Sequence, residues 1–333
     1  MQLTVSNLHR HQTGLTLVEL MVALAIGSFL MVGAIQIYNQ SRQAFVINES
    51  IARVQETAQF AMDTIEADLR MASNWGRNSR GLAVEGRSIV GDADPSGLGL
   101  PADALICGAD WALDLAQPID GDNNVYALPC GAAPGGAQPN SDVITVRRAS
   151  VQAVAPLLGT LQIQSTRIQG KIFSDGNIPG DYSAADSETH NLIVTSYYVA
   201  QTSALIAGVP TLRRHRLIGG GAAGPSIVDE EVAPGVENIQ LQLGIDVDED
   251  NTVDRYVNPG DPIYDPAAIG AGYVPGARVI TARIWMIVRS VDLEMGVQDQ
   301  NDYEPGDVDL GVPTDNYRRM QISKTILLRN ART

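Results

Sequence analysis

Four aspartates in the second half of the chain have the spacing of a metal-binding loop. They take positions 1, 3, 5 and 9 of one segment: Asp246, Asp248, Asp250 and Asp254. Alternate carboxylates at this spacing can converge on one hard cation, and Ca²⁺ prefers such oxygen ligands. The segment departs from a full EF-hand loop, because Asn251 stands at the glycine position and Val257 at position 12. Calcium binding and an acidic, solvated hairpin loop are both compatible with these residues.

Another carboxylate, Glu19, adjoins the most apolar stretch of the chain. Residues 20–41 contain no charged side chain, and about 20 such residues can span a bilayer as a helix. A carboxylate at the centre of a membrane helix costs about 2.5–3.5 kcal/mol, and less near the edge. We therefore expect Glu19 to have a compensating partner.

The segment before Glu19 indicates the direction of insertion. Residues 1–14 contain Arg10, His9 and His11 and no acidic residue. Because positive flanks stay in the cytoplasm, a single-pass inner-membrane anchor with a periplasmic body is expected. An ordinary secretory signal peptide would have a shorter apolar region that ends in a small-x-small site. A plain signal anchor would leave Glu19 unexplained, and a buried core helix suits neither the length of the run nor its basic leader.

The two cysteines, Cys107 and Cys130, lie in a segment rich in Gly, Pro and Asp. Neither belongs to a CxxC pair, so redox catalysis and zinc binding have no support. In an exported body they predict one disulfide that closes a loop, and two unpaired thiols are the alternative. Residues 85–142 are accordingly expected to form a long insertion stapled by this bond.

The elements that must position these residues begin with one long helix. Beyond the apolar run, hydrophobic residues recur at spacings of three and four: Ile51, Val54, Ala58, Met62, Ile65 and Leu69. This pattern is typical of an amphipathic helix with one buried stripe. Since no proline occurs before Pro95, a helix of about 85 Å is predicted from Leu15 to Ala72. Residues 15–41 would form its transmembrane or filament-core half, and residues 42–72 its amphipathic half.

The rest of the chain, residues 73–333, is predicted to form one β-rich periplasmic body. Short β-rich runs alternate with turn-rich stretches. Six runs predict strands: 143–146, 191–200, 212–218, 239–244, 278–291 and 324–330. A long helix followed by several strands favours an α+β fold, with the helix packed on an antiparallel sheet.

Composition and motifs exclude several functions. The 333 residues carry a formal charge of −15, whereas a general nucleic-acid binder needs a basic face. Basic clusters at residues 213–216 and 318–319 are more typical of strand positions that face solvent or pair with acids than of a DNA contact. No Ser/His/Asp arrangement, HExxH, P-loop or GxGxxG stands out, so no enzyme is expected.

The residues around Glu19 resemble the type IV prepilin processing motif. The run Gly14-Leu15-Thr16-Leu17-Val18-Glu19-Leu20 follows a short basic leader and precedes the apolar helix. The resemblance implies cleavage after Gly14 by a membrane aspartic peptidase and N-methylation of the new first residue, Leu15, where the family most often has Phe. It also implies that Glu19 pairs with the N-terminal amine of a neighbouring subunit in a filament.

Both ends of the body are similar to PilW-type minor pilins. The similarity is carried by these segments: 68–76, 235–240, 244–246, 282–290, 317–319 and 325–330. A cysteine expected shortly after Trp75-Gly76 is Arg77 instead, so no disulfide is transferred from the family. The resemblance implies a type IV pilin-like fold, and as partners other minor pilins, the major pilin, the prepilin peptidase and the inner-membrane assembly platform.

Three functions follow as hypotheses. The first is a PilW-type minor pilin that assembles into a type IV pilus at the cell surface and has a structural role; the family implies twitching motility, adhesion or DNA uptake. The second is a subunit similar to pseudopilin J of type II secretion, which shares the leader and the helix. The third is a membrane-anchored, calcium-binding periplasmic module that does not polymerise.

Overall fold

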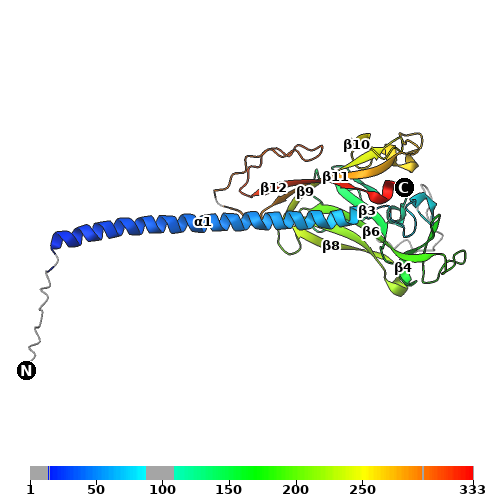
Figure 1. The fold of residues 1–333 in the computed structure, drawn as a ribbon, viewed down its shortest axis with the longest axis horizontal. Coiled ribbons are helices and arrows are strands. Elements are labelled where there is room, and N and C mark those ends of the chain that lie inside the picture. The colour runs from blue at the N-terminus through cyan, green and yellow to red at the C-terminus, as the bar shows by residue number, and fades with distance from the viewer. Residues whose placement is uncertain (1–13, 15, 88–108, 295, 333) are drawn as a thin grey trace, which may run out of the picture. The chain divides into compact units, whose positions relative to one another are not determined.

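The computed structural model describes residues 14, 16–87, 109–294 and 296–332. The chain divides into two compact units, Met1–Ile51 and Ala52–Thr333. Figure 1 shows the long helix and the strands of the body. Besides the helices and strands named below, there are short 3-10 helices: η1 (Gly81–Ala83), η2 (Gly221–Ala223), η3 (Pro262–Tyr264), η4 (Pro266–Ala268) and η5 (Arg329–Arg332).

Helix α1 (Leu17–Leu69) passes without a break from the first unit into the second. In the first unit its apolar side chains are exposed, and Phe29 is the extreme at 81 %. In the second unit one stripe is buried at the predicted spacing: Val54, Ala58, Ala61, Met62, Ile65 and Leu69. The change from an exposed apolar surface to one buried stripe is the change of pattern seen in the sequence.

The end of α1 lies slightly before the predicted Ala72. The amides of Met71 and Ala72 bond to carbonyls three residues back, at 3.1 Å each, which tightens the last turn. Ser73 then adopts a left-handed conformation with φ 62°. A residue in this conformation cannot continue the helix, so the chain turns toward the body.

The larger sheet of the body has eight strands in the order β1-β5-β4-β6-β3-β2, with β7 and β8 continuing from β6. Among the described strands of this sheet, only the β1–β5 pair is parallel. The bounds are β1 (Val84–Glu85), β2 (Ile119–Asp122), β3 (Val143–Ala149), β4 (Leu158–Ser165), β5 (Gly170–Asp175), β6 (Glu188–Ala200), β7 (Thr211–Ile218) and β8 (Ser226–Pro234). A short helix, α2 (Ala109–Leu113), precedes β2.

The smaller sheet is antiparallel, with strands in the order β10-β9-β11-β12. Its strands are β9 (Val236–Asp246), β10 (Arg255–Val257), β11 (Arg278–Arg289) and β12 (Arg319–Leu327). Along β9, Ile239, Leu241, Leu243 and Ile245 belong to the core. Because side chains alternate along a strand, Gln240, Gln242, Gly244 and Asp246 face the other side.

The main core joins the buried stripe of α1 to strands of both sheets. A second core surrounds Trp75, whose side chain is fully buried just after the helix. The structure therefore confirms the α+β prediction of one long N-terminal helix packed on a largely antiparallel β domain.

Polar contacts also fix the end of α1, through a group that we call the helix-end anchor: Glu66, Asp68, Arg148, Tyr197 and Lys324. Arg148 of β3 lies 2.7 Å from Asp68, and the Tyr197 hydroxyl of β6 donates to the same carboxylate at 2.7 Å. Lys324 of β12 pairs with Glu66. Burial and the Asp68 charge raise the pKa of Tyr197 well above its usual value, so this phenol remains a hydrogen-bond donor.

Candidate functional site

The first candidate site is the N-terminal motif. Gly14 is exposed, and a Cβ added to it would contact nothing within 4 Å. Leu15, the predicted first residue of the mature protein, lies outside the described residues. Helix α1 begins at Leu17, and this places Glu19 in its first turn.

Thr16 and Glu19 form a reciprocal cap at the start of α1. The Thr16 amide and hydroxyl donate to Glu19 Oε2 at 3.0 and 2.9 Å, and the Glu19 amide donates to Thr16 Oγ1 at 3.2 Å. This is the capping box of a Thr-x-x-Glu sequence, which satisfies amides that have no partner within the helix. The spacing of Thr16 and Glu19 in the sequence is the signal from which this cap could have been predicted.

The helix behind this cap is long and apolar enough to cross a membrane. An 18-residue window of α1 reaches a mean hydropathy of 2.2, and none of that window is buried. Length and composition alone fit a membrane span, a signal sequence or a core helix. A core helix would be mostly buried, whereas this window is exposed. The exposure argues against the core-helix alternative.

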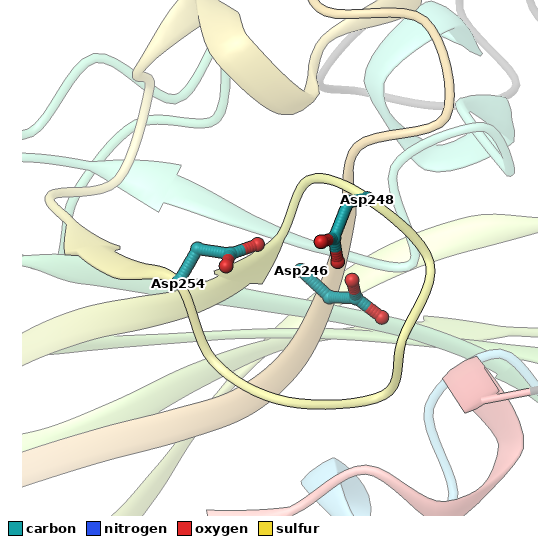
Figure 2. Close-up of side chains that lie close together, drawn as sticks. All are labelled: Asp246, Asp248 and Asp254. Carbon is teal, nitrogen blue, oxygen red and sulfur yellow. The ribbon is translucent and has the colours of Figure 1, made fainter.

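The second candidate site is the loop between β9 and β10. Figure 2 shows the carboxylates of Asp246, Asp248 and Asp254 gathered on this loop. One oxygen of each lies within 4.8 Å of the others. Asp248 also accepts the amide of Asp250 at 3.3 Å, and Asp254 Oδ2 accepts the amide of Val247 at 2.7 Å. These bonds hold the two exposed carboxylates within the loop.

The fourth predicted ligand, Asp250, is not part of this group. Its Oδ1 accepts the amide and the hydroxyl of Thr252, at 2.7 and 2.5 Å. Asp250 therefore forms a local turn, and the structure brings together three of the four predicted aspartates.

Asp246 differs from its neighbours because it is wholly buried, with an exposed fraction of 0 %. Its Oδ2 accepts Arg278 Nε and Nη2 at 3.2 and 3.0 Å, and the amide of Asn251 at 2.9 Å. Its Oδ1 has no hydrogen-bond partner among the described residues. The ion pair with Arg278 balances one of the three carboxylate charges and leaves the other two.

Of the two cysteines in the predicted disulfide, the structure describes only Cys130. Cys130 is 3 % exposed and is not a free thiol. Cys107 lies outside the described residues, so its pairing with Cys130 stays a prediction. The described part of the expected insertion is integral to the fold, because it supplies β2 to the larger sheet and Leu113 and Leu115 to the second core.

The loop around Cys130 is held by aromatic residues. The Tyr126 hydroxyl lies 2.7 Å from the Cys130 carbonyl, to which it donates, and 2.8 Å from His215 Nε2. Tyr198 stacks on His215 with ring centroids 5.0 Å apart, and its hydroxyl accepts the amide of Ala133. Burial lowers the pKa of His215, which favours the neutral ring in this cluster.

The basic cluster at residues 213–216 is paired with acids, as the sequence analysis favoured. Arg213 contacts Asp229 at 3.0 Å, and both Arg214 and Arg216 contact Glu230, at 2.8 and 2.6 Å. Hydrogen bonds from Arg216 and Arg214 lower the pKa of Glu230 to about 2 despite its partial burial. The cluster therefore joins β7 to β8, and these three arginines are committed to intramolecular pairs.

Asp142 is a buried carboxylate that the sequence analysis missed. It accepts the amides of Asn124 and Leu241 at 2.8 and 2.7 Å. Burial raises its pKa to about 7, and nearby charges such as Asp307 add to the rise, while the two amide bonds oppose it. The acid- and amide-rich run 120–124 was the available signal. Asp142 thus links the turn at Asn124 to Leu241 of β9. Its role is therefore structural.

Two family models match the chain. The model described as Type IV Pilus-assembly protein W matches residues 196–330, and the model described as Prokaryotic N-terminal methylation motif matches residues 9–35. The comparison with curated proteins gives no match. Among solved structures, a type IV-like pilin from Thermus thermophilus is similar at 15% identity and a TM-score of 0.28, over 59% of this chain and 83% of that chain.

The matched regions are those where the residues themselves carry a resemblance. Residues 9–35 include the predicted cleavage site and the start of α1. Residues 196–330 include the smaller sheet and most of the segments similar to PilW-type pilins. The two matches thus confirm the similarity of this chain to PilW-type minor pilins of type IV pili.

Proposed function

We propose that this protein is a minor pilin of the PilW type that takes part in type IV pilus assembly. The prepilin peptidase cuts it after Gly14 and methylates Leu15. The mature protein is held in the inner membrane with its body in the periplasm, and it then joins other minor pilins and the major pilin. Its role is structural, in keeping with the pilus-assembly family whose model matches residues 196–330.

The observation that carries this proposal is the two-part character of α1, combined with the methylation motif. One helix has an exposed apolar surface up to Ile51 and a buried stripe from Val54. The exposed part suits a lipid or helix-bundle environment, and the stripe fixes the helix to a folded body. A subunit that exchanges lipid for neighbouring helices during assembly requires both.

The proposed partner of Glu19 is the amine of Leu15 on a neighbouring subunit. The capping contacts from Thr16 both use Oε2 of Glu19. In a low-dielectric helix bundle, a carboxylate is tolerated when an opposite charge and hydrogen bonds accompany it. Pairing across subunits would therefore offset the burial of Glu19 and fix the axial register of the incoming subunit.

Processing is tested by intact-mass and N-terminal analysis of protein from membranes or sheared filaments, under non-reducing conditions. We expect a mature chain that begins at Leu15, carries one added methyl group, and lacks two hydrogens because of the disulfide. An intact Met1 in cells with an active prepilin peptidase would contradict the proposal. That outcome would favour an anchored periplasmic module instead.

Assembly is tested by comparing Glu19→Ala with Thr16→Val in the same cells. Both changes weaken the capping box, but only the first removes the charge. We expect Glu19→Ala to be processed yet lost from filaments, and Thr16→Val to be incorporated. Unchanged incorporation of Glu19→Ala would refute the proposed pair, and equal loss of both variants would assign the defect to helix capping.

A further inference from the structure

We propose that Asp246, Asp248 and Asp254 bind one Ca²⁺ ion, which fixes the turn of the β9–β10 hairpin. This inference concerns the second unit alone and does not depend on a role in pili. It rests on the convergence of three carboxylates and on buried oxygen atoms for which the described residues provide no hydrogen-bond partner.

The geometry of the three carboxylates suits this ion. One oxygen of each lies within 4.8 Å of the other two. Two ligands on opposite sides of Ca²⁺ are separated by about 4.8 Å, because Ca–O bonds are about 2.4 Å long. Three oxygens separated by at most 4.8 Å all lie within about 2.8 Å of one point, close to the length of a Ca–O bond. A single ion can therefore contact Asp246, Asp248 and Asp254 with at most a small adjustment of the loop, and Figure 2 shows their side chains gathered there. Backbone carbonyls and water would complete its six to eight ligands.

Unpartnered oxygens provide an independent indication. Asp246 is wholly buried, and its Oδ1 has no hydrogen-bond partner in the described chain. Thr281 of β11 is also buried, and its Oγ1 likewise lacks a partner there. This hydroxyl lies against Gly244, where an added Cβ would overlap it. Since Gly244 and Asp246 are two residues apart on β9, both face the same side of the sheet. Buried polar atoms are rarely left unsatisfied.

The local charge also favours a divalent cation. Asp246, Asp248 and Asp254 bring three negative charges, and Arg278 contributes one positive charge at 3.0 Å from Asp246. The remaining charge of two equals that of Ca²⁺. Arg278 occupies Oδ2 of Asp246 and leaves Oδ1 for the ion.

The ligands lie at three successive places along the hairpin. Asp246 ends β9, Asp248 lies in the loop, and Asp254 directly precedes β10. An ion held by all three would fix the turn, and Arg278 would link the turn to the start of β11. A site built from side chains of an exposed loop is expected to bind at about 10⁻⁴–10⁻³ M, the range of extracellular calcium modules.

Titration calorimetry of the full mature chain in detergent, after treatment with a chelator, tests the site with CaCl₂ as the probe. Asp248→Asn and Asp254→Asn remove charge from exposed ligands without altering the core. Asp250→Asn is the matched control, because it removes the same charge from the same loop outside the group. We expect one ion per chain, at least about tenfold weaker binding in the two ligand variants, and less than about twofold change in the control.

A thermal melt in CaCl₂ compared with MgCl₂ at equal concentration gives the second measurement. We expect a higher melting temperature with Ca²⁺ than with Mg²⁺, because Mg²⁺ demands shorter bonds and stricter geometry. Three outcomes would overturn the proposal: no saturable binding up to about 10 mM Ca²⁺, an equal loss in Asp250→Asn, or the same shift with both cations. The last two would indicate diffuse screening of an acidic loop.

Discussion

Removal of the Asp68 carboxylate tests the helix-end anchor most directly. In Asp68→Ala, Arg148 loses its partner at 2.7 Å. The Tyr197 hydroxyl loses its nearer acceptor at 2.7 Å and keeps the Thr64 carbonyl at 3.5 Å. The side chains of Asp68 and Arg148 are only 13% and 17% exposed, so water can replace the carboxylate only in part. The variant therefore leaves a positive charge largely desolvated at the point where α1 meets β3.

The expected loss follows from these contacts. Breaking a buried ion pair from one side costs about 3–5 kcal/mol. A hydrogen bond to a charged acceptor adds about 1.5–3 kcal/mol, but contacts that share one carboxylate are not additive. The residual exposure of the pair places the total near the lower end, at about 3–4 kcal/mol. That is a large part of a typical folding stability of about 5–15 kcal/mol.

Urea unfolding of the full mature chain in detergent, followed by tryptophan fluorescence, to which the buried Trp75 contributes, measures this loss. With a slope of about 3 kcal/mol per molar urea, the midpoint should fall by about 1 M. Asp63→Ala is the matched control: it lies on the same helix, is 55% exposed, and contacts Lys324 at 3.7 Å. An exposed pair of this kind contributes about 0–1 kcal/mol.

A double variant separates the lost charge from lost packing. If the unpaired guanidinium causes the damage, Arg148→Met added to Asp68→Ala should recover part of the stability, because both charges are then absent. A loss below about 1 kcal/mol in Asp68→Ala would refute the reasoning. So would a double variant that is no more stable than the single one.

Three further predictions concern the body. Gly76→Ala should destabilise the fold by more than about 1 kcal/mol in thermal or urea unfolding, because Gly76 has φ 91° and an added Cβ would lie 2.5 Å from His190 Cδ2; an unchanged midpoint would contradict this. Glu230 has its pKa lowered from 4.5 to about 2, first by the hydrogen bond from Arg216, so its contribution to stability is present above pH 4.5 and disappears as the pH falls toward 2. Glu230→Gln should flatten this acid limb of a stability–pH profile, and an unaltered limb would refute the assignment. Asp142 has its pKa raised from 3.8 to about 7, mainly by burial, so its contribution is fully present below pH 3.8 and is lost as the pH rises to 7; Asp142→Asn should remove that slope, and a persistent slope would implicate another group.

Elements with a strong local pattern could be predicted from the sequence. The stripe of α1 and the apolar runs that became β3, β6, β9 and β11 were predicted near their observed positions. Strand β12 was displaced: it was expected at 324–330 and lies at Arg319–Leu327, because the chain enters a 3-10 helix at Arg329–Arg332.

Strand β8 shows why other elements could not be predicted. Its centre carries Asp229, Glu230 and Glu231, which by themselves indicate a solvated loop. These acids lie opposite the arginines and histidine of β7 in the paired register. The stabilising partners come from another segment, so the propensity of β8 alone gave no sign of a strand. Strands β4 and β5 were missed as well; like most strands, they are stabilised by pairing with distant segments.

The loop between β9 and β10 shows the same limit at the scale of single side chains. Spacing placed four aspartates in one loop, but it could not show which of them converge. Asp250 is withdrawn by two bonds to Thr252, and Asp246 is buried by the fold around it. The first effect is a local competition between acceptors, and the second depends on the position of Arg278, 32 residues away along the chain.

The helix-end anchor has a mechanical consequence. The buried stripe from Val54 to Leu69 is about 22 Å long, and its last turn is bound to β3 and β6 through Asp68 and to β12 through Glu66. Tension applied along α1 would load strands of two different sheets at the same time. Rupture would then require the attachments to β3, β6 and β12 to break at the same time, and not one after another.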